Sequence, residues 1–323
     1  MSEYVFNPAS NDGQNGGEHA ATALVVAFVE TLAELDARLI GPARPLKLPC
    51  NAWDMQVSLD AEGRPLTLGG LINAFYEDGR TRDLANFFDA LQSFAPADDQ
   101  LDDAMIEAVL RLDATAPVAG HEAVYPAICE AGLEAMQCAV TEGTLVSFAH
   151  PRWDFDQGVV ACGDDQIAID HASLVQHVDA IVLRKIDAAR EEVTRRNFEV
   201  LRGRAFPSLL WGQDVVGQLQ RFPSEFLALA FRRLAKLDDI ARRWQSSGAA
   251  MPDSGSLELK PESELTMQNY AEERCYRSST GEMRTYETHV WIDSGNRIHL
   301  LLDRAARTIE IGYIGPHLRT WKH

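Results

Sequence analysis

The chain has 323 residues, of which 46% are hydrophobic and 24% are charged, and its formal net charge is −18 at pH 7. These proportions are typical of a globular protein in water, and the length favours two domains over one. No stretch approaches the roughly 18 consecutive apolar residues of a membrane-spanning helix, so we expect no membrane partner. The five cysteines include no CxxC pair, and a cytoplasmic protein is the simplest expectation.

The negative charge is concentrated in the N-terminal part of the chain. Residues 1–190 contain 11 Lys and Arg against 30 Asp and Glu, a balance of −19, whereas the remainder is close to neutral. Such an excess of carboxylates repels nucleic acid and attracts basic surfaces. A basic protein partner for the N-terminal part is therefore one hypothesis, and a merely solvated acidic surface is the plain alternative.

The N-terminal part reads as a disordered tail followed by an acidic α+β domain. Residues 1–16, rich in Asn, Gly, Ser and Pro, are assigned to the tail, and residues 17–180 to the domain. Hydrophobic periodicity predicts helices at 17–40, 66–75, 81–94, 98–112 and 125–139. Alternation predicts strands near 55–59, 145–148, 159–161 and 166–169.

A long polar helix is expected next, from about Val175 to Leu201, with its apolar residues on one stripe. We take residues 181–205 as the helix that links the two domains and residues 206–323 as the C-terminal domain. Within that domain, Phe222 to Ser246 keeps a three- and four-residue apolar spacing, which predicts a further helix.

The last fifty residues predict an antiparallel meander of three strands, at 284–293, 297–303 and 308–314. A Ser294-Gly295-Asn296 turn joins the first two strands. Alternation places Ile298 and Leu300 on one face and Arg297 and His299 on the other, and it groups Tyr313 with Ile309 and Ile311. Gly312 is suited to a bulge. The predicted fold class is α+β: an acidic N-terminal α+β domain joined by a long helix to a C-terminal helix and antiparallel β-meander.

The Arg297-Ile298-His299 run, the segment from Thr308 to Leu318 and the helix before them resemble the RelE/ParE toxin superfamily over residues 222–323. The resemblance implies one or two helices packed on a curved antiparallel sheet. It also implies either an endoribonuclease that cuts messenger RNA on the ribosome or a relative that poisons gyrase. RNA or the ribosome is then the expected partner, in a bacterial toxin-antitoxin or antiphage defence setting.

Metal-independent RNA cleavage needs a base for the 2′-hydroxyl, a cation at the phosphate and an acid for the leaving 5′-oxygen. Imidazole and guanidinium groups suit these roles. The candidate catalytic residues are Arg284, Arg297, His299 and His317. The candidate substrate-binding residues are Tyr313, Arg319 and Lys322. No cofactor or metal is expected at this site.

Each of these residues also has a structural interpretation. Arg297 and His299 on an open strand face could simply be solubilising, Tyr313 could pack in the core, and His317 could cap the chain end. The near-neutral charge of the C-terminal part departs from the basic character of ribosome-dependent toxins. Either the acidic domain therefore regulates the C-terminal domain, or the chain is a non-enzymatic interaction protein in which the meander is a scaffold.

One further constellation lies in the N-terminal part, where carboxylates and imidazoles crowd residues 150–171. Two carboxylates and a histidine could hold a divalent metal there, although no recognised ligand spacing supports it. Turn chemistry explains Asp164-Asp165 equally well. Phosphate-binding glycine loops, HExxH and GxSxG are absent from the sequence.

Overall fold

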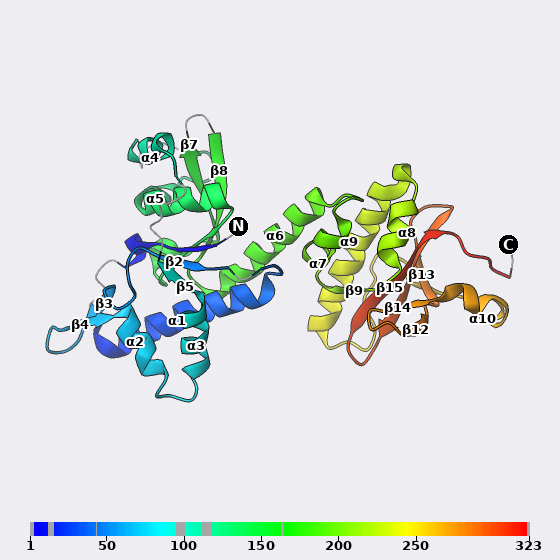
Figure 1. Cartoon of the computed structure of the whole chain (residues 1–323), viewed down its shortest axis with the longest axis horizontal. Coiled ribbons are helices and arrows are strands. Elements are labelled where there is room, and N and C mark those ends of the chain that lie inside the picture. The colour runs from blue at the N-terminus through cyan, green and yellow to red at the C-terminus, as the bar shows by residue number, and fades with distance from the viewer. Residues whose placement is uncertain are drawn as a thin grey trace. The chain divides into compact units, whose positions relative to one another are not determined.

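The computed structural model describes residues 3–11, 16–42, 44–94, 101–111, 118–162 and 165–321. The chain divides into two compact units, Met1–Arg184 and Lys185–His323 (Figure 1). Both units contain helices and strands, and the second contains an antiparallel meander, so the predicted α+β class is confirmed. Within the described ranges, no helix is long and apolar enough to cross a membrane.

The first unit is built on a six-stranded sheet of order β5-β2-β1-β6-β8-β7. Its strands are β1 (Tyr4–Phe6), β2 (Leu46–Leu48), β5 (Gln92–Phe94), β6 (Thr144–Val146), β7 (Gln157–Cys162) and β8 (Asp165–Ala172). All neighbours pair in parallel except β7 and β8, which form an antiparallel pair. Parallel strands need crossover connections; α-helices lie between β1, β2, β5 and β6 along the chain, whereas β7 lies between β6 and β8.

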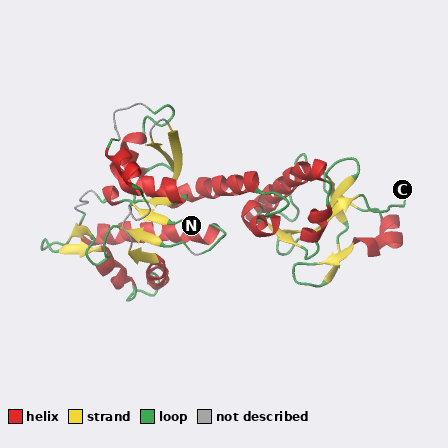
Figure 2. Ribbon diagram, turned by 45° about the horizontal axis from the view of Figure 1, so that its top comes forward, coloured by secondary structure: helices red, strands yellow, loops and turns green. Residues whose placement is uncertain are grey.

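Helices cover both faces of this sheet, as the ribbon views show (Figures 1 and 2). They are α1 (Gly17–Arg38), α2 (Leu68–Phe75), α3 (Arg82–Leu91), α4 (Asp103–Leu110) and α5 (Tyr125–Thr141). Adjacent residues of β1 point to opposite faces: Val5 belongs to the cluster around α5, whereas the ring of Phe6 packs edge-on against Phe28 of α1 at 5.5 Å. A small hairpin, β3 (Gln56–Leu59) with β4 (Pro65–Thr67), lies outside the sheet.

The prediction of a disordered tail over residues 1–16 is wrong for the described part of that segment. β1 lies inside the sheet, between β2 and β6, and Tyr4, Val5 and Phe6 are at most 1% exposed. The polar residues that follow, from Asn7 onward, suggested a tail because the three-residue apolar run is too short to show periodicity. Residues 1, 2 and 12–15 lie outside the described residues.

Buried polar groups join the carboxyl ends of β1, β6 and β8. Asn7 donates from Nδ2 to the Ser147 hydroxyl at 3.0 Å, and Nε2 of His171 lies 2.8 Å from the same oxygen. Nδ1 of His171 lies 2.7 Å from the carbonyl oxygen of Phe155. Burial lowers the pKa of His171 to about 3, so this imidazole is neutral at physiological pH. The network satisfies polar groups that burial would otherwise leave unpaired.

The predicted linking helix over residues 181–205 is two helices, α6 (Val178–Glu192) and α7 (Phe198–Ala205). Between them, the side chain of Asn197 accepts hydrogen bonds from the backbone and hydroxyl of Thr194, a local alternative to helical bonding. The boundary between the two units falls inside α6. Residues from the end of α6, the connection after it and α7 belong to the core of the second unit: Ala189, Val193, Phe198, Leu201 and Ala205.

The second unit contains a five-stranded sheet of order β10-β13-β14-β15-β9. Its strands are β9 (Leu209–Trp211), β10 (Lys260–Pro261), β13 (Thr288–Trp291), β14 (Asn296–Asp303) and β15 (Thr308–Pro316). Helices α8 (Val215–Arg221) and α9 (Ser224–Ser247) enter the same apolar core as this sheet. The predicted helix from Phe222 to Ser246 is confirmed, and Leu234, Leu237 and Trp244 on its apolar stripe are at most 1% exposed.

The first strand of the predicted meander is interrupted. Its beginning forms β12 (Met283–Thr285), which pairs with β11 (Cys275–Arg277) in a separate two-stranded sheet, and α10 (Glu264–Tyr270) precedes this pair. At the interruption, the Tyr286 amide donates to the carbonyl of Arg274 at 2.9 Å. The chain leaves the strand at Tyr286, and the Tyr286 ring packs over Gly312, where a Cβ atom would lie 2.4 Å from it.

The bulge expected at Gly312 is present. Opposite β14, His299 pairs with Tyr313 while Leu300 pairs with Ile311, so Gly312 is the extra residue on β15. One extra residue inverts the alternation beyond it. The assignment of Tyr313 to the face of Ile309 and Ile311 is therefore wrong: its ring lies on the face of His299, 5.7 Å from that imidazole between ring centroids.

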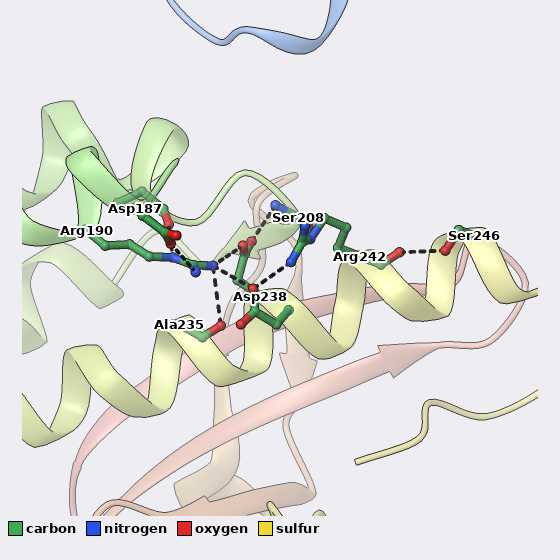
Figure 3. Close-up of polar contacts among 9 residues, drawn as sticks. Asp187, Arg190, Ser208, Ala235, Asp238, Arg242 and Ser246 are labelled. Atoms are coloured by element: carbon green, nitrogen blue, oxygen red, sulfur yellow. Dashed lines mark hydrogen bonds and ion pairs between the residues drawn. The ribbon is translucent and has the colours of Figure 1, made fainter. Parts of the chain in front are cut away.

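A buried ion pair joins α6 to α9 within the second unit (Figure 3). Asp238 has no exposed surface and binds Nη2 of Arg190 at 2.7 Å through Oδ2, while its Oδ1 accepts from the backbone amide of Ser208 at 2.6 Å. Arg190 also contacts Asp239 at 3.0 Å. Burial raises the pKa of Asp238 to about 6, because removing a carboxylate from water outweighs the attraction of the guanidinium.

Candidate functional site

The face of the second sheet opposite the helices carries a band of polar and aromatic side chains. On β13 and β14, His289 stands directly across from His299, and Trp291 across from Arg297. Side chains directly opposite on antiparallel strands share a face and lie close together. Accordingly, the two imidazole centroids are 5.4 Å apart, and the Arg297 guanidinium carbon lies 3.6 Å from the centroid of the Trp291 ring.

Glu262, which follows β10, extends this band. Its Oε1 lies 3.5 Å from Nδ1 of His289 and accepts hydrogen bonds from Nε and Nη2 of Arg274 at 3.1 and 2.9 Å. The Arg274 side chain is completely buried, and its remaining donors reach the carbonyl oxygens of Tyr270 and Arg319. Arg274 thus ties Glu262, α10 and the C-terminal segment into one polar cluster.

A pocket of about 650 Å³ opens beside this cluster. Two half-exposed indoles, Trp291 at 47% and Trp321 at 59%, stand among its lining residues. Arg297 and His317 line the same pocket, and Glu262 borders it. The pocket therefore combines flat aromatic surfaces, a guanidinium group and an exposed imidazole.

Arg297 is held rigidly rather than extended into water. It is 3% exposed, and its Nη1 donates to the carbonyl oxygens of Asp293 and Asn296 at 2.8 and 2.9 Å. Its buried Nε makes no hydrogen bond to the described part of the chain. Burial lowers the pKa of Arg297 from its ordinary value, but so basic a group stays charged at neutral pH.

The two imidazoles behind the pocket are neutral at physiological pH. Burial lowers the pKa of His299 to about 3, and it lowers the pKa of His289 despite the nearby Glu262 carboxylate. His299 is 1% exposed, and Nδ1 lies 3.1 Å from the carbonyl oxygen of Tyr286. So weak a base is poorly matched to proton transfer near neutral pH.

The structure brings together two of the four predicted catalytic residues at the pocket, Arg297 and His317. His299 lies on the same sheet face but is not among the residues that line the pocket. Arg284 stands on β12 in the other sheet, where it is exposed and paired with Glu282 at 2.9 Å. The interruption at Tyr286 separates Arg284 from β13, so the four residues do not form one constellation.

The predicted substrate-binding residues also divide. Tyr313 stacks on Tyr276 with 5.1 Å between ring centroids and donates its hydroxyl to the carbonyl of Pro316 at 2.9 Å. Arg319 is exposed and ion-paired with Glu273, and neither it nor Tyr313 lines the pocket. Lys322 lies outside the described residues.

Sequence reasoning missed Glu262, Arg274, His289, Trp291 and Trp321. A signal existed for two of them, because His289 and Trp291 alternate with the core residue Val290 and so fall on the polar side of their strand. No local pattern could identify Glu262 or Arg274, since only tertiary packing brings them to the sheet.

Three of the carboxylates considered for a metal in the N-terminal part are held by other side chains. Asp156 and Asp170 both bind Arg184, at 3.1 and 2.8 Å, and Asp154 pairs with His177 at 3.0 Å. Asp164 lies outside the described residues. Among the described residues, the three-residue grouping of metal-ligand side chains that does occur lies in the second unit: Glu262, His289 and His299.

Comparisons with known proteins provide no template for this site. No protein-family model, curated protein or solved structure matches the chain.

Proposed function

We propose that the second unit is a toxin-like, RNA-acting effector whose pocket holds an unpaired nucleotide for endonucleolytic cleavage. The observation that carries this proposal is the convergence of Arg297, His317 and two half-exposed tryptophans on one pocket. Indole faces stack on bases without strict sequence preference, and a guanidinium binds phosphate oxygens. The resemblance of residues 222–323 to the RelE/ParE superfamily is consistent with this use and with a role in toxin-antitoxin or defence systems.

The chemistry requires no external reactant. A base removes the proton of the ribose 2′-hydroxyl, the 2′-oxygen attacks phosphorus, and the 5′-oxygen leaves with a proton, which produces a 2′,3′-cyclic phosphate. We assign proton transfer to His317, which is the exposed imidazole of the pocket. Arg297 stabilises charge on the phosphate, and Trp291 stacks on the base.

The two units differ in net charge, and this gives them different roles in the proposed function. The first unit carries 9 Lys and Arg against 29 Asp and Glu, a net charge of −20, while the second carries 21 against 19, a net charge of +2. RNA is therefore repelled by the first unit and is not strongly attracted by the second. The acidic unit then acts as a regulatory domain that suppresses non-specific RNA binding.

The test is incubation of the full chain with a single-stranded RNA and with the matching DNA, which lacks the 2′-hydroxyl. We expect cleavage of the RNA alone, with cyclic phosphate ends. His317→Ala should slow it about 10²-fold or more, the usual contribution of a general acid or base. Trp291→Ala should weaken RNA binding by about 5- to 150-fold, which corresponds to the loss of one stacked base.

Matched controls are Arg304→Ala, an exposed cation between β14 and β15, and His150→Ala in the first unit. Both should cleave at the rate of the unmodified chain. The proposal fails if RNA and DNA are cut alike, if no RNA is cut, or if His317→Ala retains full activity.

A second candidate function follows from the charge of −20 on the first unit. There the chain is a non-enzymatic interaction protein that binds a basic protein partner electrostatically. We expect a Lys- and Arg-rich peptide to bind the full chain at low ionic strength, and to bind at least tenfold more weakly at 0.3 M salt, where charges are strongly screened. His317→Ala should leave this binding unchanged. Binding that is insensitive to salt would argue against this function.

A further inference from the structure

Glu262, His289 and His299 bring three metal-ligand side chains together from three separate segments of the second unit. Their ligand atoms all lie within 4.8 Å of one another. Antiparallel pairing of β13 and β14 sets the two histidines side by side, and pairing of β10 with β13 brings Glu262 alongside them. Regular backbone therefore positions all three groups, which favours a defined site over a chance surface cluster.

Each of the two histidines has a ring nitrogen that its hydrogen bonds to the described residues leave open. Nδ1 of His299, 3.1 Å from the Tyr286 carbonyl, acts as the donor there, since a carbonyl oxygen can only accept; Nε2 then carries the lone pair. In metal-bound histidines, the ring nitrogen that does not bind the metal usually donates a hydrogen bond of this kind to a backbone carbonyl. The buried Nδ1 of His289 has no hydrogen-bond partner in the described part of the chain.

The positive charge of Arg274 opposes the binding of a cation by Glu262, His289 and His299. Its guanidinium binds Oε1 of Glu262 and cancels the charge of that carboxylate. A carboxylate has a second oxygen, however, and none of the hydrogen bonds of Arg274 uses it. Arg274 thus resembles the outer-shell donors that orient ligating carboxylates, and its charge limits affinity without blocking coordination.

We propose that Glu262, His289 and His299 bind one divalent transition-metal ion of the Zn²⁺ type. Two imidazoles with one carboxylate favour Zn²⁺, Fe²⁺ or Mn²⁺, whereas Ca²⁺ and Mg²⁺ prefer oxygen ligands alone. Ligand distances of about 2.0–2.2 Å for zinc place neighbouring ligand atoms about 3.4 Å apart. The ligand atoms of the three side chains lie within 4.8 Å of one another, so small side-chain rotations bring them to that separation.

Three protein ligands leave at least one coordination position for water or another small ligand. Because Glu262 also lines the pocket, an ion held by this carboxylate lies at the pocket wall. The proposal is independent of the RNA-cleaving function, which uses protein side chains alone.

The test uses the full chain, stripped of metal with a chelator and desalted, and titrated by calorimetry with Zn²⁺, Mn²⁺ and Mg²⁺. We expect one Zn²⁺ per chain, weaker Mn²⁺ binding and no saturable Mg²⁺ binding. Bound Zn²⁺ should also raise the melting temperature of the chain, because the ion binds only the folded site. Co²⁺ in place of Zn²⁺ should give the visible spectrum of nitrogen and oxygen ligands without a thiolate charge-transfer band.

His289→Ala and Glu262→Gln should each weaken Zn²⁺ binding at least 100-fold. Glu262→Gln keeps the size of the side chain, so it tests the ligand even if the alanine variant folds poorly. Cys275→Ser in the same unit and His150→Ala in the other should bind Zn²⁺ as the unmodified chain does. The proposal is overturned if Zn²⁺ does not saturate at one ion, if both ligand variants retain full affinity, or if Cys275→Ser abolishes binding.

Failure of this site and failure of the RNA-cleaving function give different results. If RNA cleavage persists in chelator and Zn²⁺ does not bind, the proposed metal site is refuted and the nuclease proposal stands. If one Zn²⁺ binds per chain and no RNA is cleaved, the nuclease proposal is refuted and the proposed metal site stands.

Discussion

Replacing Asp238 with alanine is expected to lower the free energy of unfolding of the second unit by about 3–5 kcal/mol, the usual cost of removing one partner of a buried ion pair. The carboxylate has no exposed surface and serves both Arg190 and the amide of Ser208 (Figure 3). Its loss leaves a mostly buried guanidinium paired with the more exposed carboxylates Asp239 and Asp187, and an amide without its acceptor. Hydrogen exchange of α9 amides during chemical denaturation measures this unit by itself.

Two further variants separate the effect of the lost charge from the effects of the lost hydrogen bond and of burial. Asp238→Asn keeps an acceptor for Ser208 but removes the charge, so it should lower the free energy of unfolding less than Asp238→Ala does. Asp239→Ala removes the ion pairs with Arg190 and Arg242, but this carboxylate is 33% exposed, so the loss of unfolding free energy should stay below about 1 kcal/mol. Equal losses for Asp238→Ala and Asp239→Ala would show that burial does not set the strength of this contact.

Replacing Arg274 with methionine is the second change for which we expect a large loss, again about 3–5 kcal/mol. The guanidinium is fully buried and holds Glu262 together with the carbonyl oxygens of Tyr270 and Arg319. Methionine fills much of the volume but leaves the Glu262 carboxylate, 7% exposed, without its counter-charge. Denaturation with hydrogen exchange of β13 and β14 amides measures the loss where it occurs.

Arg284→Met is the matched control, because Arg284 forms an exposed pair with Glu282 in the same unit. Its expected loss is below about 1 kcal/mol. Zn²⁺ should restore part of the stability of Arg274→Met, since a bound dication supplies the charge that Glu262 has lost. If Arg274→Met and Arg284→Met lose the same amount, Arg274 does not organise the cluster.

Helix α9 and strand β14 could be predicted because their apolar residues follow the helical or strand period without interruption. The three- and four-residue spacing on α9 and the alternation on β14 each act locally, through burial of one face. Asp238 falls on the same buried stripe as Leu234 and Ala241, and an acid at such a position is a sequence signal for a buried ion pair.

Prediction failed where one residue changed the geometry of everything after it. The extra residue at Gly312 turned Tyr313 to the opposite face, and the interruption at Tyr286 moved Arg284 into another sheet. The bulge at Gly312 was expected, but its inversion of the alternation beyond it was not applied to Tyr313. The interruption at Tyr286 has no distinct hydrophobic pattern. The short strand β1 was not predicted for a related reason, since three buried residues do not establish a period.

The sequence by itself determined the α+β class, the helix and meander of the second unit, and the uneven charge, since each depends on residue type and local spacing. Only the tertiary structure decided that Arg297 and His317 share a pocket with two tryptophans while His299 lies buried with His289 and Glu262. Strand register and the packing of the segments at 262 and 274 fix those contacts. Such contacts join residues far apart in the chain, and local periodicity carries no information about them.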